Sequence, residues 1–144
     1  MKKVELKSII QSIGKEKKAY HYSTDDGVYL SESHFIIRFD DKKYAQYVID
    51  EVSKKKKKPE WSELPLLENF YKDIKGDFCS DISEEELKDG REILFLKTDD
   101  LKVKINKKFT VPGGTFYING KTQPVYEFVD GATLMILPIN WSAT

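Results

Sequence analysis

Between Glu92 and Ile139 the chain alternates short apolar runs with turn residues. Each run consists of β-forming residues beside a short turn: 93–96 and 101–105 flank Thr98-Asp99-Asp100, 115–118 ends at Asn119-Gly120, and 125–129 meets 134–137 across Asp130-Gly131. Two-residue turns between such runs are signals for β-hairpins. The pattern therefore predicts antiparallel hairpins in the C-terminal part, with the rest of the chain packed around them.

Three further β-forming runs precede these hairpins and predict a meander near the N-terminus. They cover 20–22, 28–30 and 35–39. Asp25-Asp26-Gly27 and Ser31-Glu32-Ser33 supply the polar turns between them. The meander and the hairpins together predict a mainly antiparallel sheet.

Helical spacing of apolar residues marks three segments, and a capping box marks a fourth. The stripes are Leu6, Ile9, Ile10 and Ile13, ended by Gly14; Tyr44, Tyr47, Val48 and Val52, capped by Asp40 or Asp41 and ended near Lys54; and Leu66, Leu67, Phe70, Tyr71 and Ile74, ended by Gly76. A strand over Lys2 to Glu5 is an option before the first stripe. Ser83 with Glu86 fits a capping box, and Gly90 ends the one or two helical turns that it predicts.

These elements predict an α+β fold in which a mainly antiparallel sheet packs against two to four short helices. The 144 residues show no long-period repeat and no second linker besides the lysine-rich stretch before Pro59. We therefore expect a single domain over residues 1–144.

Composition excludes several classes of function. The 24 basic and 24 acidic side chains cancel, so no global field steers the chain toward nucleic acid or an anionic membrane. The single cysteine, Cys79, excludes an intramolecular disulfide and favours a reducing compartment. No apolar run approaches the ~20 residues that span a bilayer, so we expect no membrane contact and a cytoplasmic location.

Asn140-Trp141-Ser142 matches a glycosylation acceptor, but without a secretory signal we interpret it as a strand end.

Residues with possible chemistry have simpler structural explanations. His21 and His34 lie among strand residues without the spacing of a metal motif, and Cys79 has no neighbouring cation in sequence to lower its pKa. The paired aspartates at 25–26, 40–41 and 99–100 fit turns and helix starts. Gly113-Gly114 after Pro112 favours a tight turn over a phosphate-binding loop. We expect no catalytic residues, no metal and no cofactor.

Two charged segments are the candidate binding residues. The basic one comprises Lys54, Lys55, Lys56, Lys57 and Lys58 with Trp61, and the acidic one includes Asp81, Glu84, Glu85 and Glu86. The lysines can contact phosphates while the indole stacks on a base, or they form a solvated helix end. The acidic residues can face a basic partner, or they form a solvated cap.

Several stretches of the C-terminal third carry a family resemblance. They are Gln123-Pro124-Val125-Tyr126, Asp130-Gly131 and Leu134-Met135-Ile136-Leu137-Pro138-Ile139, preceded by Lys104-Ile105-Asn106-Lys107-Lys108-Phe109. Together they resemble the closing hairpin of the bacterial DNA polymerase sliding clamp (beta subunit) and the segment before it. Small proteins of phages that infect Gram-positive bacteria look similar here. The resemblance implies a clamp-subdomain-like fold.

The chain also departs from the clamp family. A clamp subdomain usually has a helix where Thr110-Val111-Pro112-Gly113-Gly114 stands, and proline with two glycines disfavours a helix. A clamp ring also needs several subdomains and a basic inner face. The resemblance therefore implies kinship of fold more than clamp function.

We expect a non-enzymatic binding protein, encoded by a phage or prophage, that docks on a host replication or defence protein in the host cytoplasm as an inhibitor or modulator. The alternative is a small nucleic-acid-binding protein that uses Lys54 to Lys58. An enzyme that uses His21, His34 or a carboxylate pair is the third hypothesis. The sequence leaves the oligomeric state open.

Overall fold

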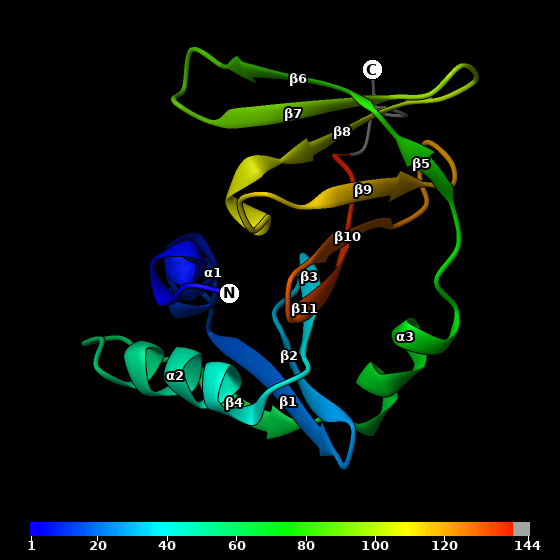
Figure 1. Ribbon diagram of the computed structural model, residues 1–144. Coiled ribbons are helices and arrows are strands. Elements are labelled where there is room, and N and C mark those ends of the chain that lie inside the picture. Colours follow the sequence, from blue (N-terminus) through cyan, green and yellow to red (C-terminus); the bar gives the residue numbers. More distant parts are fainter. Residues whose placement is uncertain (140–144) are drawn as a thin grey trace.

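The computed structural model describes residues 1–139 and shows a mixed α+β chain with mostly antiparallel strands (Figure 1). Its helical segments are η1 (Lys3–Leu6), α1 (Lys7–Gly14), α2 (Lys42–Ser53), η2 (Pro65–Glu68), α3 (Asn69–Lys72) and η3 (Lys107–Phe109). Its strands are β1 (Lys18–Thr24), β2 (Gly27–Ser31), β3 (Phe35–Phe39), β4 (Glu60–Glu63), β5 (Asp77–Cys79), β6 (Asp81–Glu86), β7 (Glu92–Lys97), β8 (Lys102–Asn106), β9 (Thr115–Ile118), β10 (Val125–Val129) and β11 (Ala132–Ile136). The α+β class is confirmed, and Asn140-Trp141-Ser142 lies outside the described residues.

The N-terminal meander forms as its pattern predicts. β1 pairs antiparallel with β2 across Asp25-Asp26, and β2 pairs antiparallel with β3. α1 buries Ile9 and Ile13, so its apolar stripe faces the core. Asp41 caps α2, because its side chain accepts from the backbone N–H of Lys43 at 3.0 Å. Local pattern and local hydrogen bonding agree in this part of the chain.

Pairing of β3 with β11 joins the meander to the C-terminal hairpins. The result is an eight-stranded sheet in the order β4-β1-β2-β3-β11-β10-β9-β5. All neighbours in it pair antiparallel except β1 and β4, which are parallel. Asp130-Gly131 makes the predicted two-residue turn between β10 and β11, and Gly131 adopts φ +86°, a conformation that favours glycine.

A second sheet of three strands, β6-β7-β8, lies above the first in Figure 1. The chain passes directly from β5 to β6 through Ser80, and the backbone N–H of Ile139 donates to the carbonyl of Lys104 in β8. One hydrophobic cluster includes residues of both sheets and of α1 and α2. The main core therefore lies between the two sheets and under these helices.

The opposite face of the eight-stranded sheet carries a smaller aromatic cluster. Its buried members are Tyr29, Leu67, Phe70 and Tyr126. The segment of η2 and α3 supplies Leu67 and Phe70 and so covers part of this face. Within residues 1–139 no helix combines the length and the apolar character needed to cross a membrane.

Four local predictions are wrong. Ser83 to Gly90 forms strand β6 and a turn, because pairing with β7 satisfies backbone groups, whereas a helix there has only Ile82 and Leu87 as apolar residues to bury. Lys3–Leu6 is a 3₁₀ helix where a strand was an option. The helix expected between Leu66 and Ile74 ends at Lys72. Residues 119–124 form a longer loop between β9 and β10 than a two-residue turn.

Candidate functional site

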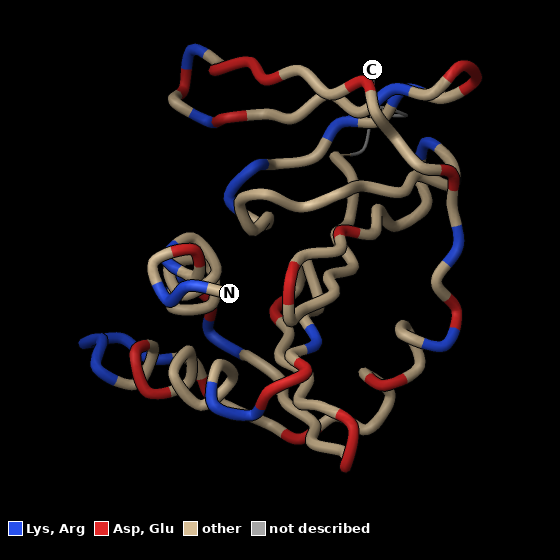
Figure 2. Tube along the Cα trace, in the orientation of Figure 1, with Lys and Arg blue, Asp and Glu red and all other residues tan. Residues whose placement is uncertain are grey.

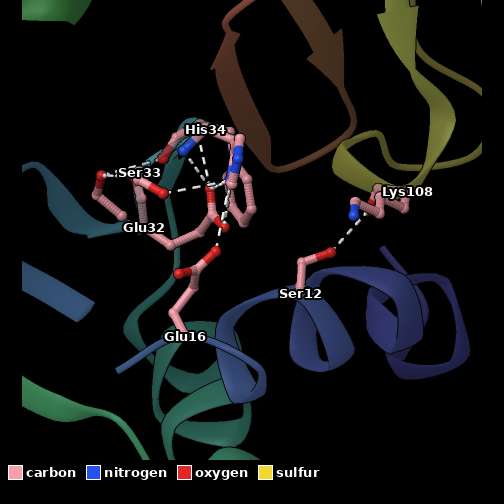
Figure 3. Close-up of polar contacts among 8 residues, drawn as sticks. Ser12, Glu16, Glu32, Ser33, His34 and Lys108 are labelled. Carbon is pink, nitrogen blue, oxygen red and sulfur yellow. Dashed lines mark hydrogen bonds and ion pairs between the residues drawn. The ribbon is translucent and has the colours of Figure 1, made fainter. Parts of the chain in front are cut away.

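Glu16, Glu32 and His34 form a cluster of polar side chains where α1 meets the turn between β2 and β3 (Figure 3). Glu16 lies two residues beyond the end of α1. Glu32 and His34 lie in the β2–β3 turn, which closes as the backbone N–H of Glu32 donates to the carbonyl of Phe35 at 3.3 Å. The sequence pattern predicted His34 to be a strand residue, whereas it lies in the turn, and nothing in the pattern connects it with Glu16.

The carboxylate of Glu32 is the buried centre of this cluster, with a side chain 1% exposed. One oxygen, Oε1, accepts from the backbone N–H groups of His34 and Phe35. The other, Oε2, lies 2.9 Å from Nδ1 of His34. Burial raises the pKa of the Glu32 carboxyl, and the hydrogen bonds from His34 oppose that rise.

Two further contacts fix the imidazole of His34. Its Nδ1 lies 3.5 Å from Oε1 of Glu16, and its ring stacks on Phe109 with centroids 4.7 Å apart and planes 11° apart. The side chain of His34 is 49% exposed, so solvent reaches the cluster. The imidazole is therefore held in one orientation at a solvent-accessible position.

Two serines of α1 hold that helix against the segment that contains Phe109. Ser12 donates to the carbonyl of Lys108 at 3.2 Å, and Ser8 donates to the carbonyl of Thr110 at 3.1 Å (Figure 3 shows the Ser12 bond). Each bond joins residues about a hundred positions apart in sequence. Together they hold the C-terminal part of α1 in place, and with it Glu16, which lies between α1 and β1. The cluster is thus a product of tertiary packing.

The arrangement suits ligation better than nucleophilic catalysis. Ser33 Oγ lies 3.3 Å from Nδ1 of His34, the same nitrogen that Glu32 contacts. A serine relay needs the hydroxyl and the carboxylate at opposite ring nitrogens. Two carboxylates and one imidazole nitrogen, in contrast, are a donor set that divalent cations accept.

The lysine run lies beside a second basic segment. Lys54 ends α2 and pairs with Glu51 at 3.1 Å, and the side chain of Lys55 crosses Gly14 closely enough to leave no space for a Cβ there. The backbone N–H of Glu60 donates to the carbonyl of Lys17 at 2.9 Å. The run 54–58 therefore lies beside Lys15, Lys17 and Lys18. Figure 2 shows the run as a blue stretch at the far end of α2.

Trp61 packs inward from this basic surface. It pairs with Ala19 where β4 joins β1, and its half-buried ring packs against the main core. Its Nε1 atom is buried and has no hydrogen-bond partner among residues 1–139. The Trp61 side chain therefore has a packing role. Its half-buried ring does not offer an exposed face on which a base could stack.

The acidic residues lie along an edge strand. Asp81, Glu84, Glu85 and Glu86 belong to β6, whose six residues are all exposed and which forms one edge of the three-stranded sheet. Lys107 contacts Glu84 at 2.8 Å and Glu92 at 3.2 Å, so one cation compensates part of the acidic charge. These contacts lower the pKa of Glu84. In Figure 2 the segment is red along the upper strand.

The other chemical candidates have structural roles. Cys79 is buried, and its thiol donates to the carbonyl of Lys97 at 3.0 Å; burial raises its pKa, so it is a poor thiolate. Asp25-Asp26 and Asp99-Asp100 lie at turns, and Asp41 caps α2. Pro112-Gly113 forms a tight turn, as predicted, with Gly113 at φ +82°.

Glu127 in β10 carries a buried carboxyl that was not among the residues predicted from the sequence. It is fully buried, and Oε1 accepts from the backbone N–H of Val111 at 3.0 Å, whereas Oε2 has no hydrogen-bond partner within the part of the chain that the structure describes. Burial raises its pKa to about 8. A signal was available, because alternation along a strand places Glu127 on the same face as Val125 and Val129.

Comparisons with protein family models, with curated proteins and with solved structures find no match. The resemblance to the sliding clamp therefore stays a prediction. Function has to be argued from the residues of this chain.

Proposed function

We propose that this protein is a non-enzymatic binding protein that pairs an extended basic segment of a partner protein with strand β6. The observation that carries the proposal is the edge position of β6, with all six residues exposed. An edge strand has unpaired backbone N–H and C=O groups, and an extended peptide can add to them as a further strand. On the basis of the clamp resemblance, we propose a host replication or defence protein as the partner.

Charge selects the partner. The carboxylates of Asp81, Glu84, Glu85 and Glu86 oppose pairing of one β6 with another and favour a strand rich in lysine or arginine. Ile82 is 41% exposed and offers one apolar contact. Backbone pairing thus supplies affinity, and the carboxylates supply specificity.

The test combines affinity capture with hydrogen exchange. The wild-type protein and the variant Glu85→Lys/Glu86→Lys are used to capture proteins from host lysate, and each captured protein is then purified and titrated. We expect the variant to bind at least ~tenfold more weakly, since two like-charge contacts replace two opposite-charge contacts. Slower amide exchange across residues 81–86 in the complex is the second expected result.

The control is Asp99→Lys/Asp100→Lys, which makes the same change of charge at the exposed β7–β8 turn. It should bind as tightly as the wild type. If the control and the β6 variant lose equal affinity, the loss is caused by the change in net charge and not by contacts along β6, which contradicts the proposal. If amides of β6 exchange at the same rate with and without the partner, pairing along β6 is refuted.

A second candidate function, binding of single-stranded nucleic acid, is favoured by the surface that joins Lys54–Lys58 to Lys15, Lys17 and Lys18. Phosphate contacts release counterions, so the logarithm of the affinity should fall with the logarithm of salt concentration by about 0.7 per lysine in contact. Alanine at 54–58 should therefore reduce the slope by about 3.5 units. An unchanged affinity at low salt would exclude this candidate.

A further inference from the structure

Three donor atoms from two separate segments come together at the end of α1. They are Oε1 of Glu16, Oε2 of Glu32 and Nδ1 of His34, and potential ligand atoms of the three residues lie within 4.8 Å of one another. We propose that Glu16, Glu32 and His34 form a binding site for a divalent transition-metal cation, and that Zn²⁺ fits their donor set best. This inference is independent of the proposed function of β6.

The separations of the donor atoms match a small tetrahedral site. Zn–N and Zn–O bonds near 2.1 Å place neighbouring ligands roughly 3.4 Å apart in a tetrahedron. Nδ1 of His34 lies 2.9 Å from Oε2 of Glu32 and 3.5 Å from Oε1 of Glu16. Both separations lie within about 0.5 Å of this value, and the ligand oxygens of Glu16 and Glu32 lie within 4.8 Å of each other.

Two of the ligands are held in place by groups outside the donor set. Oε1 of Glu32 accepts from the backbone N–H groups of His34 and Phe35, so Oε2, which faces Nδ1 of His34, is the oxygen that ligates the cation. The imidazole of His34 stacks on Phe109 at 4.7 Å. Hydrogen bonds and packing that orient ligands in this way raise metal affinity, because less freedom is lost on binding.

The site has an open side. A cleft of about 480 Å³ is lined by Glu16 and Ser33 together with Lys15, Lys17 and Tyr20. The cleft reaches Glu16, and the side chain of His34 is 49% exposed, so a cation and a water molecule as fourth ligand can approach the imidazole from solvent. The nearby lysines oppose a cation at longer range, an effect that ~0.15 M salt reduces since the Debye length is then about 8 Å.

The donor set also separates Zn²⁺ from the hard cations. Ca²⁺ takes six to eight oxygen ligands and Mg²⁺ keeps an octahedron of oxygens, whereas imidazole nitrogen suits Zn²⁺ and similar ions. Two carboxylates balance the charge of a divalent ion when the imidazole is neutral. Mg²⁺ and Ca²⁺ are therefore the matched controls, because they have the same charge and different ligand preferences.

The experiment is a calorimetric titration of the untagged chain with ZnCl₂ at pH 7.5 in phosphate-free buffer with ~0.15 M salt. We expect one ion per chain and no saturable heat with Mg²⁺ or Ca²⁺. Glu16→Gln and His34→Gln should each weaken binding at least ~tenfold, because each removes a ligand. His21→Gln is the matched control and should bind like the wild type, since His21 lies on β1 outside the cluster.

Nuclear magnetic resonance of the wild type gives a result that does not depend on whether variants fold. The chain has two histidines, so their imidazole signals report separately on the cluster and on β1. Zn²⁺ should shift the signals of His34 and leave those of His21 in place. The proposal is overturned by an absence of saturable Zn²⁺ binding, by equal affinity in all three variants, or by a shift confined to His21.

Discussion

The buried carboxyl of Glu127 makes stability depend on pH in a way that one substitution should remove. In the folded chain its pKa is about 8, against an ordinary value of 4.5. The cause is burial, which disfavours the charged form and is opposed only by the hydrogen bond from the Val111 N–H. Between these two pH values the folded state retains a proton that the unfolded state has lost.

The sign and the magnitude of this pH dependence of stability follow from proton linkage. A carboxyl whose pKa is raised in the folded state contributes stability that is fully present below its unfolded pKa and is lost as the pH rises through the folded one. Each pH unit between about 4.5 and 8 therefore lowers the free energy of unfolding by about 1.4 kcal/mol. The total loss across this window is about 5 kcal/mol.

The perturbation is Glu127→Gln, which keeps the shape of the side chain and cannot ionise. Urea unfolding at pH 5.5, 6.5, 7.5 and 8.5 gives the free energy of unfolding of both proteins. We expect the stability of the wild type relative to Glu127→Gln to fall by about 3 kcal/mol from pH 5.5 to pH 7.5 and to level off above pH 8. Taking the difference in free energy of unfolding between the two proteins at each pH removes the contributions of the other groups that titrate in this range, because both proteins share them.

Glu85→Gln is the matched control, because Glu85 is an exposed glutamate on β6. It should show the same pH dependence as the wild type. A difference between wild type and Glu127→Gln that stays constant from pH 5.5 to pH 8.5 would refute the reasoning, since Glu127 would then be ionised to the same extent in both states.

Three further predictions concern stability and reactivity. Gly114→Ala should destabilise the fold by about 2 kcal/mol in urea unfolding, because a Cβ there clashes with the buried carboxyl of Glu127; a change below ~0.5 kcal/mol would contradict this. Asp41→Ala should cost about 1 kcal/mol through loss of the cap on the Lys43 N–H, and Asp41→Asn should restore most of it. Cys79 should react with a thiol reagent only on unfolding, so equal rates with and without denaturant would contradict its burial.

Local pattern determined several elements of this protein by itself. α1 and α2 follow from apolar residues at helical spacing, with Gly14 ending the first and Asp41 capping the second. The turn at Asp130-Gly131 follows from the glycine, because Gly131 adopts a positive φ that other residues disfavour. These features depend on interactions within a few residues, which is why the sequence predicts them.

Pairing with other strands decided the elements that local pattern predicted wrongly or left open. Ser83 and Glu86 match a helix start, but β6 forms a hairpin with the next strand, β7, and this ladder satisfies backbone N–H and C=O groups of both strands. Pairing of β3 with β11 joins segments that are far apart in the chain. No local signal specifies the pairing of β3 with β11.

The candidate sites divide in the same way. The sequence marks Lys54–Lys58 and the acidic run as charged segments, but only the fold places the lysines beside Lys15, Lys17 and Lys18 and the acidic residues on an edge strand. The approach of Glu16 to Glu32 and His34 depends on the packing of α1 against η3. Residue type is fixed by the sequence, whereas proximity depends on which surfaces are buried together.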